Sequence, residues 1–171
     1  MMPGDLALAV DSETRFADAP AGHQDELRLW LRLLTCSTLV EGEIRRRLRR
    51  HFGTTLPRFD LLAQLQRVDQ GLTLGELSRR MMVTNGNVTG LATRLEAEGL
   101  IGRRTSATDR RAQTLRLTPR GRREFARQSA AHEGWIAELF GGLAAADRAT
   151  LHRLLGRLKS GVGNALREAS A

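Results

Sequence analysis

Residues 73–117 read TLGELSRRMMVTNGNVTGLATRLEAEGLIGRRTSATDRRAQTLRL, and this stretch decides the fold. Its first half has the apolar spacing of two short helices joined by a tight turn. Thr73, followed three residues later by Glu76, has the pattern of a capping box and predicts that the first helix begins there. We expect Thr84 to cap the second helix and Gly99 to end it, as the residue past the C-cap. This half therefore predicts a helix-turn-helix.

The second half of the stretch changes to strand-like spacing. Residues 100–105 and 113–117 flank the polar segment SATDRRA, which predicts a hairpin with an exposed tip. A helix-turn-helix followed at once by a two-stranded hairpin is a winged helix. The inward face of its two helices is expected to consist of Leu74, Leu77, Met81, Val88, Leu91, Ala92 and Leu95.

Helical periodicity continues on both sides of this core. Before it, helices are predicted from Asp25 to about Arg50 and from about Pro57 to Val68. After it, Thr118 and Pro119 begin a helix that runs to about Phe140, and a last helix covers about 145–167. The predicted fold class is mainly α with a small β-hairpin wing, a winged helix-turn-helix with a helical dimerisation region from both termini.

The outer helices carry apolar stripes that are too extensive to stay uncovered, so they predict a dimer. The stripe of the first helix includes Trp30, Leu34 and Ile44, and that of the last includes Leu151, Leu155 and Leu158. The predicted organisation is an N-terminal tail (1–22), a dimerisation helix (23–55), a DNA-binding core (56–118) and C-terminal dimerisation helices (119–171). The tail has acidic flanks and a short apolar run, so we expect neither a signal peptide nor an anchor, and a cytoplasmic protein.

The charge is strongly basic and almost wholly arginine. The formal net charge is +8, and Lys159 is the only lysine. Arginine binds phosphate through two parallel hydrogen bonds, which favours a nucleic-acid partner. Arginine usage can also reflect genome composition, so the placement of the charges has to decide.

The outward face of the second helix of the helix-turn-helix is polar and small. Asn can pair with adenine edges in the major groove, and Thr can hydrogen-bond a base or touch a thymine methyl. Two glycines one turn apart would let the backbone approach DNA; the alternative is that they only weaken an exposed helix, by about 1 kcal/mol each. The predicted major-groove residues are Thr84, Asn85, Gly86, Asn87, Thr89, Gly90, Thr93 and Arg94.

The hairpin region has eight arginines and one acid between residues 100 and 123. A charge run is often only a solvated face, but here it lies beside the predicted recognition helix, where phosphate contacts fall. The arginines are Arg103, Arg104, Arg110, Arg111, Arg116, Arg120, Arg122 and Arg123. The predicted wing contacts are Arg103, Arg104, Arg110 and Arg111, with Asp109 holding the Arg111 guanidinium for the minor groove.

The segments LTLGELSRRMMVTNGNVTGLATRLEAEGLI and RRTSATDRRAQTLRLTPRG resemble the DNA-binding core of MarR-family regulators over about residues 56–125. The resemblance implies a homodimer with the helix from Thr84 in the major groove and Arg111 in the minor groove of double-stranded DNA. Two-fold symmetry implies a pseudo-palindromic operator with half-sites roughly 10 bp apart. It also implies repression relieved by a small-molecule inducer, bound between the dimerisation helices and the winged helix.

The segments LRLWLRLLTCSTLVEGE and TLPRFDLLAQL look similar to regulators of hydroxycinnamate and related aromatic-acid catabolism, some of which respond to a CoA thioester. This similarity implies an aromatic acid or its CoA thioester as effector, and no other cofactor. The alternative is that these aromatic residues are core residues and the arginines face water. The candidate ligand-binding residues are Trp30, Arg32, Leu33, Cys36, Arg58, Phe59 and Leu62.

Other function classes find less support. Cys36 is the only cysteine and is expected to be a buried helix residue; the alternative is a one-cysteine redox sensor. An enzyme is not expected, because the four histidines are dispersed without metal-ligand spacing and no nucleophile has a nearby base. A constitutive architectural nucleic-acid-binding protein and a protein-interaction module remain alternatives, because a winged helix alone does not determine function.

The wing motif gives a first test. Asp109→Ala removes a negative charge from a basic region, so simple electrostatics would raise DNA affinity. If Asp109 instead holds Arg111 at the turn, the substitution lowers affinity for the operator duplex. Fluorescence anisotropy with a labelled duplex separates the two, and a rise in affinity would exclude the bracing role.

Overall fold

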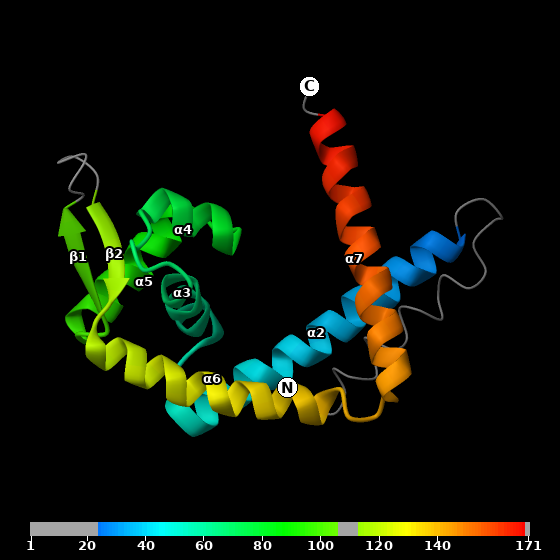
Figure 1. Cartoon of the computed structure of the whole chain (residues 1–171), viewed down its shortest axis with the longest axis horizontal. Helices are drawn as coiled ribbons and strands as arrows, with labels where there is room; N and C mark the ends of the chain where they lie inside the picture. The colour runs from blue at the N-terminus through cyan, green and yellow to red at the C-terminus, as the bar shows by residue number, and fades with distance from the viewer. Residues whose placement is uncertain (1–23, 106–112, 170–171) are drawn as a thin grey trace. The chain divides into compact units, whose positions relative to one another are not determined.

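The computed structural model describes residues 24–105 and 113–169 (Figure 1). The predicted N-terminal tail and the wing tip with Asp109, Arg110 and Arg111 lie outside the described residues. The chain divides into two compact units, one up to His132 and one from Glu133 onward. The elements are α2 (Gln24–Phe52), α3 (Leu56–Gln66), α4 (Leu74–Met81), α5 (Asn85–Ala97), β1 (Ile101–Thr105), β2 (Gln113–Leu117), α6 (Pro119–Leu139) and α7 (Ala145–Glu168). The fold is therefore mainly helical with a two-stranded hairpin, as the sequence predicts.

The first helix of the helix-turn-helix begins with the predicted capping box. The Thr73 hydroxyl accepts a hydrogen bond from the Glu76 backbone N–H at 3.2 Å, and the Thr73 backbone N–H donates to Glu76 Oε2 at 2.8 Å. These bonds hold the pKa of Glu76 below its ordinary value. Thr84 occupies the N-cap position of α5, but its side chain makes no capping hydrogen bond. Its predicted position is correct, and the predicted side-chain cap is absent.

The turn between α4 and α5 carries a residue in the left-handed conformation. Met82 has φ 55° and is 93% exposed. A non-glycine residue is uncommon there, because its Cβ crowds the following carbonyl. The Ser78 hydroxyl donates to the Val83 carbonyl at 2.5 Å, and the Val83 N–H donates to the Ser78 carbonyl at 3.2 Å. These two bonds close the turn and fix the angle at which α5 leaves it.

The core of the winged helix is almost entirely aliphatic. Each such side chain contributes roughly 1.5–3 kcal/mol when fully buried, so the core supplies most of the favourable free energy. The sheet joins this core through alternate residues of β2. The buried cluster consists of Leu61, Leu62, Leu65, Leu72, Leu77, Val88, Ala92, Leu95, Leu100, Ile101, Leu115 and Leu117.

The hairpin is anchored to the rest of the winged helix by an isolated β-bridge between Leu72 and Leu115. Ile101 pairs with Leu117 in the antiparallel register of β1 and β2. Leu72 exchanges backbone hydrogen bonds with Leu115, at 3.1 and 2.8 Å, and so extends the sheet. Gly71 precedes this bridge with φ +80°, and a Cβ on it would lie 2.5 Å from the Leu115 carbonyl oxygen. Only glycine allows the chain to come this close to β2.

The start of α6 packs tightly against the start of the hairpin. A Cβ on Gly121 would lie 1.9 Å from the Leu100 carbonyl oxygen. The Thr118 hydroxyl donates to the Gly99 carbonyl at 2.7 Å and accepts from the Gly121 N–H at 3.0 Å. Thr118 and Gly121 of the LTPRG segment therefore fix where α6 begins.

The outer helices expose most of their apolar residues. In α2, which is described throughout, only Ile44 and Leu48 are buried. Cys36 is exposed, so the prediction that it is buried within the chain is wrong: the buried residues of α2, Ile44 and Leu48, lie nearer its C-terminal end. No residue of the fully described α7 is buried. None of the described helices is long and apolar enough to span a membrane.

The contact at Gly121 predicts a large loss of stability on adding one methyl group. Gly121→Ala places a Cβ 1.9 Å from a backbone oxygen, well inside the van der Waals contact distance. The substitution should lower the free energy of unfolding by roughly 3 kcal/mol. Gly90→Ala is the matched control, because a Cβ there meets nothing within 4 Å. It should raise stability by about 0.5–1 kcal/mol, the ordinary gain for glycine in a helix. Urea denaturation at one protein concentration measures both, and equal effects would refute the contact.

Candidate nucleic-acid interface

Helix α5 divides cleanly into a buried face and an exposed face. Val88, Ala92 and Leu95 are fully buried in the core. All eight residues predicted to enter the major groove are exposed: Thr84, Asn85, Gly86, Asn87, Thr89, Gly90, Thr93 and Arg94. The structure therefore brings the predicted set together on one surface of one helix.

The two glycines of this surface have no role in the chain's own packing. A Cβ on either Gly86 or Gly90 would meet no heavy atom within 4 Å. Both are in regular helix, where glycine lowers stability relative to alanine. Intramolecular packing thus does not explain these glycines, whereas close approach of another molecule to the helix backbone does.

The two threonines use their hydroxyl hydrogens within the helix. The Thr89 hydroxyl donates to the Asn85 carbonyl at 2.8 Å, and the Thr93 hydroxyl donates to the Thr89 carbonyl at 3.0 Å. Each oxygen keeps lone pairs for accepting, and each side chain keeps an exposed methyl group. These threonines are therefore equipped to accept from a base amino group or to contact a thymine methyl.

The pairing register of the hairpin places two neighbouring arginines on opposite sides of the sheet, which the sequence pattern alone did not predict. Arg103 lies opposite Leu115, on the side of the sheet that faces the core, and its Nε donates to Glu96 of α5 at 2.9 Å. Arg104 lies opposite Thr114, on the other side. It is exposed, and its guanidinium has no hydrogen-bond or ion-pair partner among the described residues. Arg103 holds the hairpin against α5, and Arg104 is available for phosphate.

Other arginines take roles that the sequence pattern did not assign. Arg79 and Arg80 end α4, are exposed, and pair with no other described side chain. In the sequence, their position just before the turn of the helix-turn-helix could have indicated that they belong to the basic surface. Arg116, by contrast, donates to the Gln70 carbonyl at 2.9 Å and supports the loop before the Leu72 bridge.

A polar cavity lies on the opposite side of α5 from the exposed face. Its volume is about 350 Å³. The side chains that line it come from segments far apart in the sequence: Phe52, Gly53, Thr54, Arg58, Leu62, Leu95, Glu98, Leu100, Arg120, Glu124 and Gln128. A cavity of this size and mixed lining is in the range of small-molecule sites.

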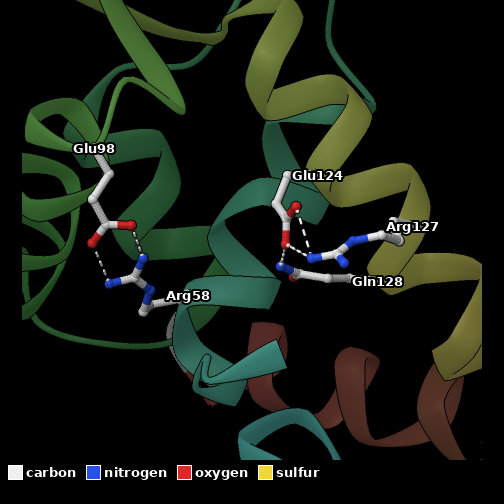
Figure 2. Close-up of polar contacts among 5 residues, drawn as sticks. All are labelled: Arg58, Glu98, Glu124, Arg127 and Gln128. Carbon is white, nitrogen blue, oxygen red and sulfur yellow. Dashed lines mark hydrogen bonds and ion pairs between the residues drawn. The ribbon is translucent and has the colours of Figure 1, made fainter. Parts of the chain in front are cut away.

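Two groups of polar contacts border this cavity (Figure 2). The Arg58 guanidinium of α3 donates to both carboxylate oxygens of Glu98, one of them at 2.8 Å. These bonds lower the pKa of Glu98 from its ordinary value. On α6, Glu124 accepts from Gln128 at 2.8 Å and from Arg127 at 3.0 Å.

The cavity also contains buried polar atoms without a partner. Gln128 is only 2% exposed, and its Oε1 accepts no hydrogen bond from any residue that the structure describes. The Nε–H of Arg58 is buried and has no acceptor within residues 24–105 and 113–169. Buried polar groups without partners cost free energy, so a bound molecule or water that satisfied them would be held favourably.

The predicted ligand-binding residues fall into two places. Arg58 and Leu62 line the cavity, and Phe59 packs beside them against Phe125 and His132, with ring centroids 5.4 and 4.9 Å apart. The four candidates of α2 do not line it: Trp30, Arg32, Leu33 and Cys36. Sequence reasoning missed Glu98, Arg120, Glu124 and Gln128, because nothing local marks residues that meet only in the folded chain. Within the described residues, no group of three His, Cys, Asp or Glu side chains could hold a metal ion.

The contrast between the two hairpin arginines gives a test of wing anchoring. Arg103→Ala removes the bond to Glu96, in which both side chains are 35% exposed. Such a pair contributes up to about 1 kcal/mol, so the amide hydrogens of β1 and β2 should exchange up to roughly fivefold faster. Arg104→Ala should leave these rates unchanged. Hydrogen exchange read by NMR decides, and equal rates in the two variants would contradict the anchoring role.

Comparison with known proteins places these features in a family. A sequence model of the MarR family matches residues 52–112. An HTH-type transcriptional regulator of Bacillus cereus is 36% identical over 93 residues, and the transcriptional activatory protein BadR of Rhodopseudomonas palustris is 32% identical over 97. These matches include 54% and 56% of this chain, but only 60% and 55% of the two relatives. The chain thus spans little more than half the length of the curated relatives it matches.

Solved structures align over more of the chain. A MarR family regulator of Streptomyces coelicolor in complex with DNA has the same fold, with a TM-score of 0.71, 24% identity, and coverage of 84% of this chain and 92% of that one. A MarR family protein of Mycobacterium tuberculosis in complex with salicylic acid aligns with a TM-score of 0.63 and 28% sequence identity, and the match covers 83% of this chain and 98% of that one. A MarR family regulator of Silicibacter pomeroyi aligns with a TM-score of 0.68 and 36% sequence identity, and the match covers 82% of this chain and 98% of that one. The match to nearly the whole of that solved member shows that this chain belongs to the MarR family.

Proposed function

We propose that the protein is a sequence-specific transcriptional regulator that binds double-stranded DNA. The exposed face of α5 carries this proposal. It gathers amide, hydroxyl and guanidinium groups on one surface, together with two glycines that the chain's own packing does not require. This combination suits a helix that enters the major groove and reads base edges.

The surrounding arginines then position the helix on the phosphate backbone. Arg104 lies on the outer side of the hairpin, and Arg79 and Arg80 lie at the end of α4. Contacts to phosphate set register and affinity, whereas contacts from α5 to bases set sequence preference. The wing tip with Arg110 and Arg111 is proposed to reach the adjacent minor groove.

We infer that the functional unit is a homodimer, working in the cytoplasm. Six apolar residues of α7 are between 38% and 65% exposed, at the spacing of one helix face: Leu151, Leu154, Leu155, Leu158, Val162 and Leu166. In α2, Leu27, Trp30 and Leu34 are also exposed. A second copy of the chain is the simplest cover for both stripes, and its two-fold symmetry gives a pseudo-palindromic operator.

The proposed effector is an aromatic acid or its CoA thioester. The support is the cavity beside Arg58, whose guanidinium suits a carboxylate, and a family member, 28% identical, whose solved structure contains salicylic acid. Because the sequence is similar to regulators of hydroxycinnamate catabolism, we propose that the genes it regulates form a catabolic operon. We propose that the effector relieves repression of this operon, whereas the relative BadR is a transcriptional activatory protein.

Binding to DNA immediately upstream of the protein's own gene tests the regulator. The full chain is titrated against this duplex and a scrambled duplex at two salt concentrations. A specific regulator should prefer its operator by roughly 10³-fold or more. Equal affinities that fall steeply with salt would show phosphate attraction only, and would favour an architectural protein instead.

The glycines of α5 give the sharper prediction. Gly86→Ala and Gly90→Ala should each raise stability by about 0.5–1 kcal/mol, because both sites are open helix positions. Operator affinity should nevertheless fall, since each added methyl group blocks close approach of the helix to the bases. The same anisotropy titration and urea denaturation measure both effects. Unchanged operator affinity in both variants would contradict groove binding by this face.

A further inference from the structure

We propose that Thr89 and Thr93 of α5 recognise thymine, and that they do so through their methyl groups instead of their hydroxyl groups. Gly86 and Gly90 lie beside them and leave the space that a thymine methyl group occupies. The operator then carries thymine where α5 enters the major groove. This inference rests on the proposed function, because it names the base that the same helix face reads.

The hydroxyl hydrogens of the two threonines are already used inside the helix. Thr89 donates its hydrogen to the Asn85 carbonyl at 2.8 Å, and Thr93 donates to the Thr89 carbonyl at 3.0 Å. A hydroxyl group has only one hydrogen to donate, so neither side chain can also donate to guanine O6, a purine N7 or thymine O4. The same bonds restrict rotation about χ1, which holds each methyl group in one direction. Two ways of reading a base remain: the oxygen can accept from an amino group, or the methyl group can contact a thymine methyl group.

The glycines place an apolar surface next to these methyl groups. At about 3.6 residues per turn, Gly86 and Gly90 lie along the middle of the exposed face, opposite the buried Val88. Thr89 and Thr93 follow one edge of that line. A Cβ on either glycine would meet no described atom within 4 Å. Two glycine CH2 groups and two threonine methyl groups thus form one apolar strip.

The opposite edge of the face carries hydrogen-bond donors. Asn87 and Arg94 lie on the far side of the glycines, are exposed, and pair with no other described side chain. Their amide and guanidinium groups can donate to the base acceptors to which the threonines cannot. The face therefore has donors along one edge and apolar surface along the other.

An apolar strip in the major groove favours thymine. The C5-methyl of thymine is the apolar group in the pattern that base pairs present there, and the other positions are donors and acceptors. An amino group of adenine or cytosine against the strip would exchange water for a surface with few acceptors, at a cost in free energy. A thymine methyl group in the same place gains from leaving water. Thymine is thus the base that this strip fits.

Uracil-substituted DNA tests the assignment. The full chain is titrated by fluorescence anisotropy against the duplex from upstream of its gene, made once with thymine and once with uracil. Uracil keeps the base pairing and the charge and lacks only the methyl group. Loss of each methyl contact should weaken binding about fourfold, the effect of exposing one buried methyl group to water. Equal affinity for the two duplexes would overturn the inference.

Two substitutions of Thr89 separate its methyl group from its hydroxyl group. Thr89→Ser removes the methyl group and should reduce the preference for the thymine duplex about fourfold per half-site. Thr89→Val keeps a methyl group and removes the hydroxyl group, so the preference should remain. Comparing variants on the same two duplexes cancels any effect of uracil on the DNA itself. A serine variant that keeps the full preference, or a valine variant that loses it, would overturn recognition through the methyl group.

Gly90→Ala tests the space beside the threonines. The added methyl group occupies the place of the thymine methyl group, so the variant should bind the thymine duplex more weakly than the unmodified chain, and the uracil duplex no more weakly. Arg94→Ala is the matched control on the other edge of α5, and it should weaken binding to both duplexes by the same factor. An equal loss on both duplexes in Gly90→Ala would contradict a thymine methyl group at this place.

A scrambled duplex distinguishes failure of this inference from failure of the proposed function. If the chain prefers the upstream duplex to the scrambled one but does not respond to uracil, only the thymine assignment is wrong. If it has no preference over the scrambled duplex, the proposed function is wrong and the thymine assignment is wrong with it.

Discussion

Helix α5 has one face buried in the core and one face exposed, and most of the winged helix is built around this arrangement. Val88, Ala92 and Leu95 fix the helix to an aliphatic core formed by α3, α4 and the hairpin. Because these buried residues hold the helix in place, the residues of its exposed face are not needed for packing, and two of them can be glycine. Arg103 extends the same support to the hairpin through Glu96. The rigid inner half thus gives the exposed half a defined orientation.

Features that depend on neighbouring residues could be predicted from the sequence. The capping box of Thr73 and Glu76, the helix end at Gly99 and the strand bounds follow from chemistry within a few residues. The outer face of α5 was predictable for the same reason, since helical spacing alone separates it from the core. Thr84 shows the limit of this reasoning: a suitable residue stands at the cap, but its hydroxyl is not used.

Features that depend on distant residues could not be predicted. Arg58 and Glu98 are 40 positions apart, and no local pattern marks them as partners. Arg103 and Arg104 look equivalent in the sequence, and only the pairing register places them on opposite sides of the hairpin. Cys36 was expected to be a buried helix residue because of the small and apolar residues around it in the sequence, yet its side chain is exposed. In each case tertiary packing, which sequence spacing does not encode, decides the outcome.

The cavity and the exposed face of α5 lie on two sides of one helix, whose C-terminal end is tied to α3 by the ion pair of Arg58 and Glu98. A partly exposed ion pair such as Arg58–Glu98 contributes about 1 kcal/mol at most, or roughly fivefold in an equilibrium constant. In the dimer proposed above, bound to a two-fold operator, loss of this ion pair would occur once in each subunit, and the two factors would multiply to roughly 25-fold. This lies within the coupling of 1–3 kcal/mol that is typical of allosteric proteins. One weak ion pair per subunit would therefore be enough to change the affinity of the proposed dimer for DNA to a measurable extent.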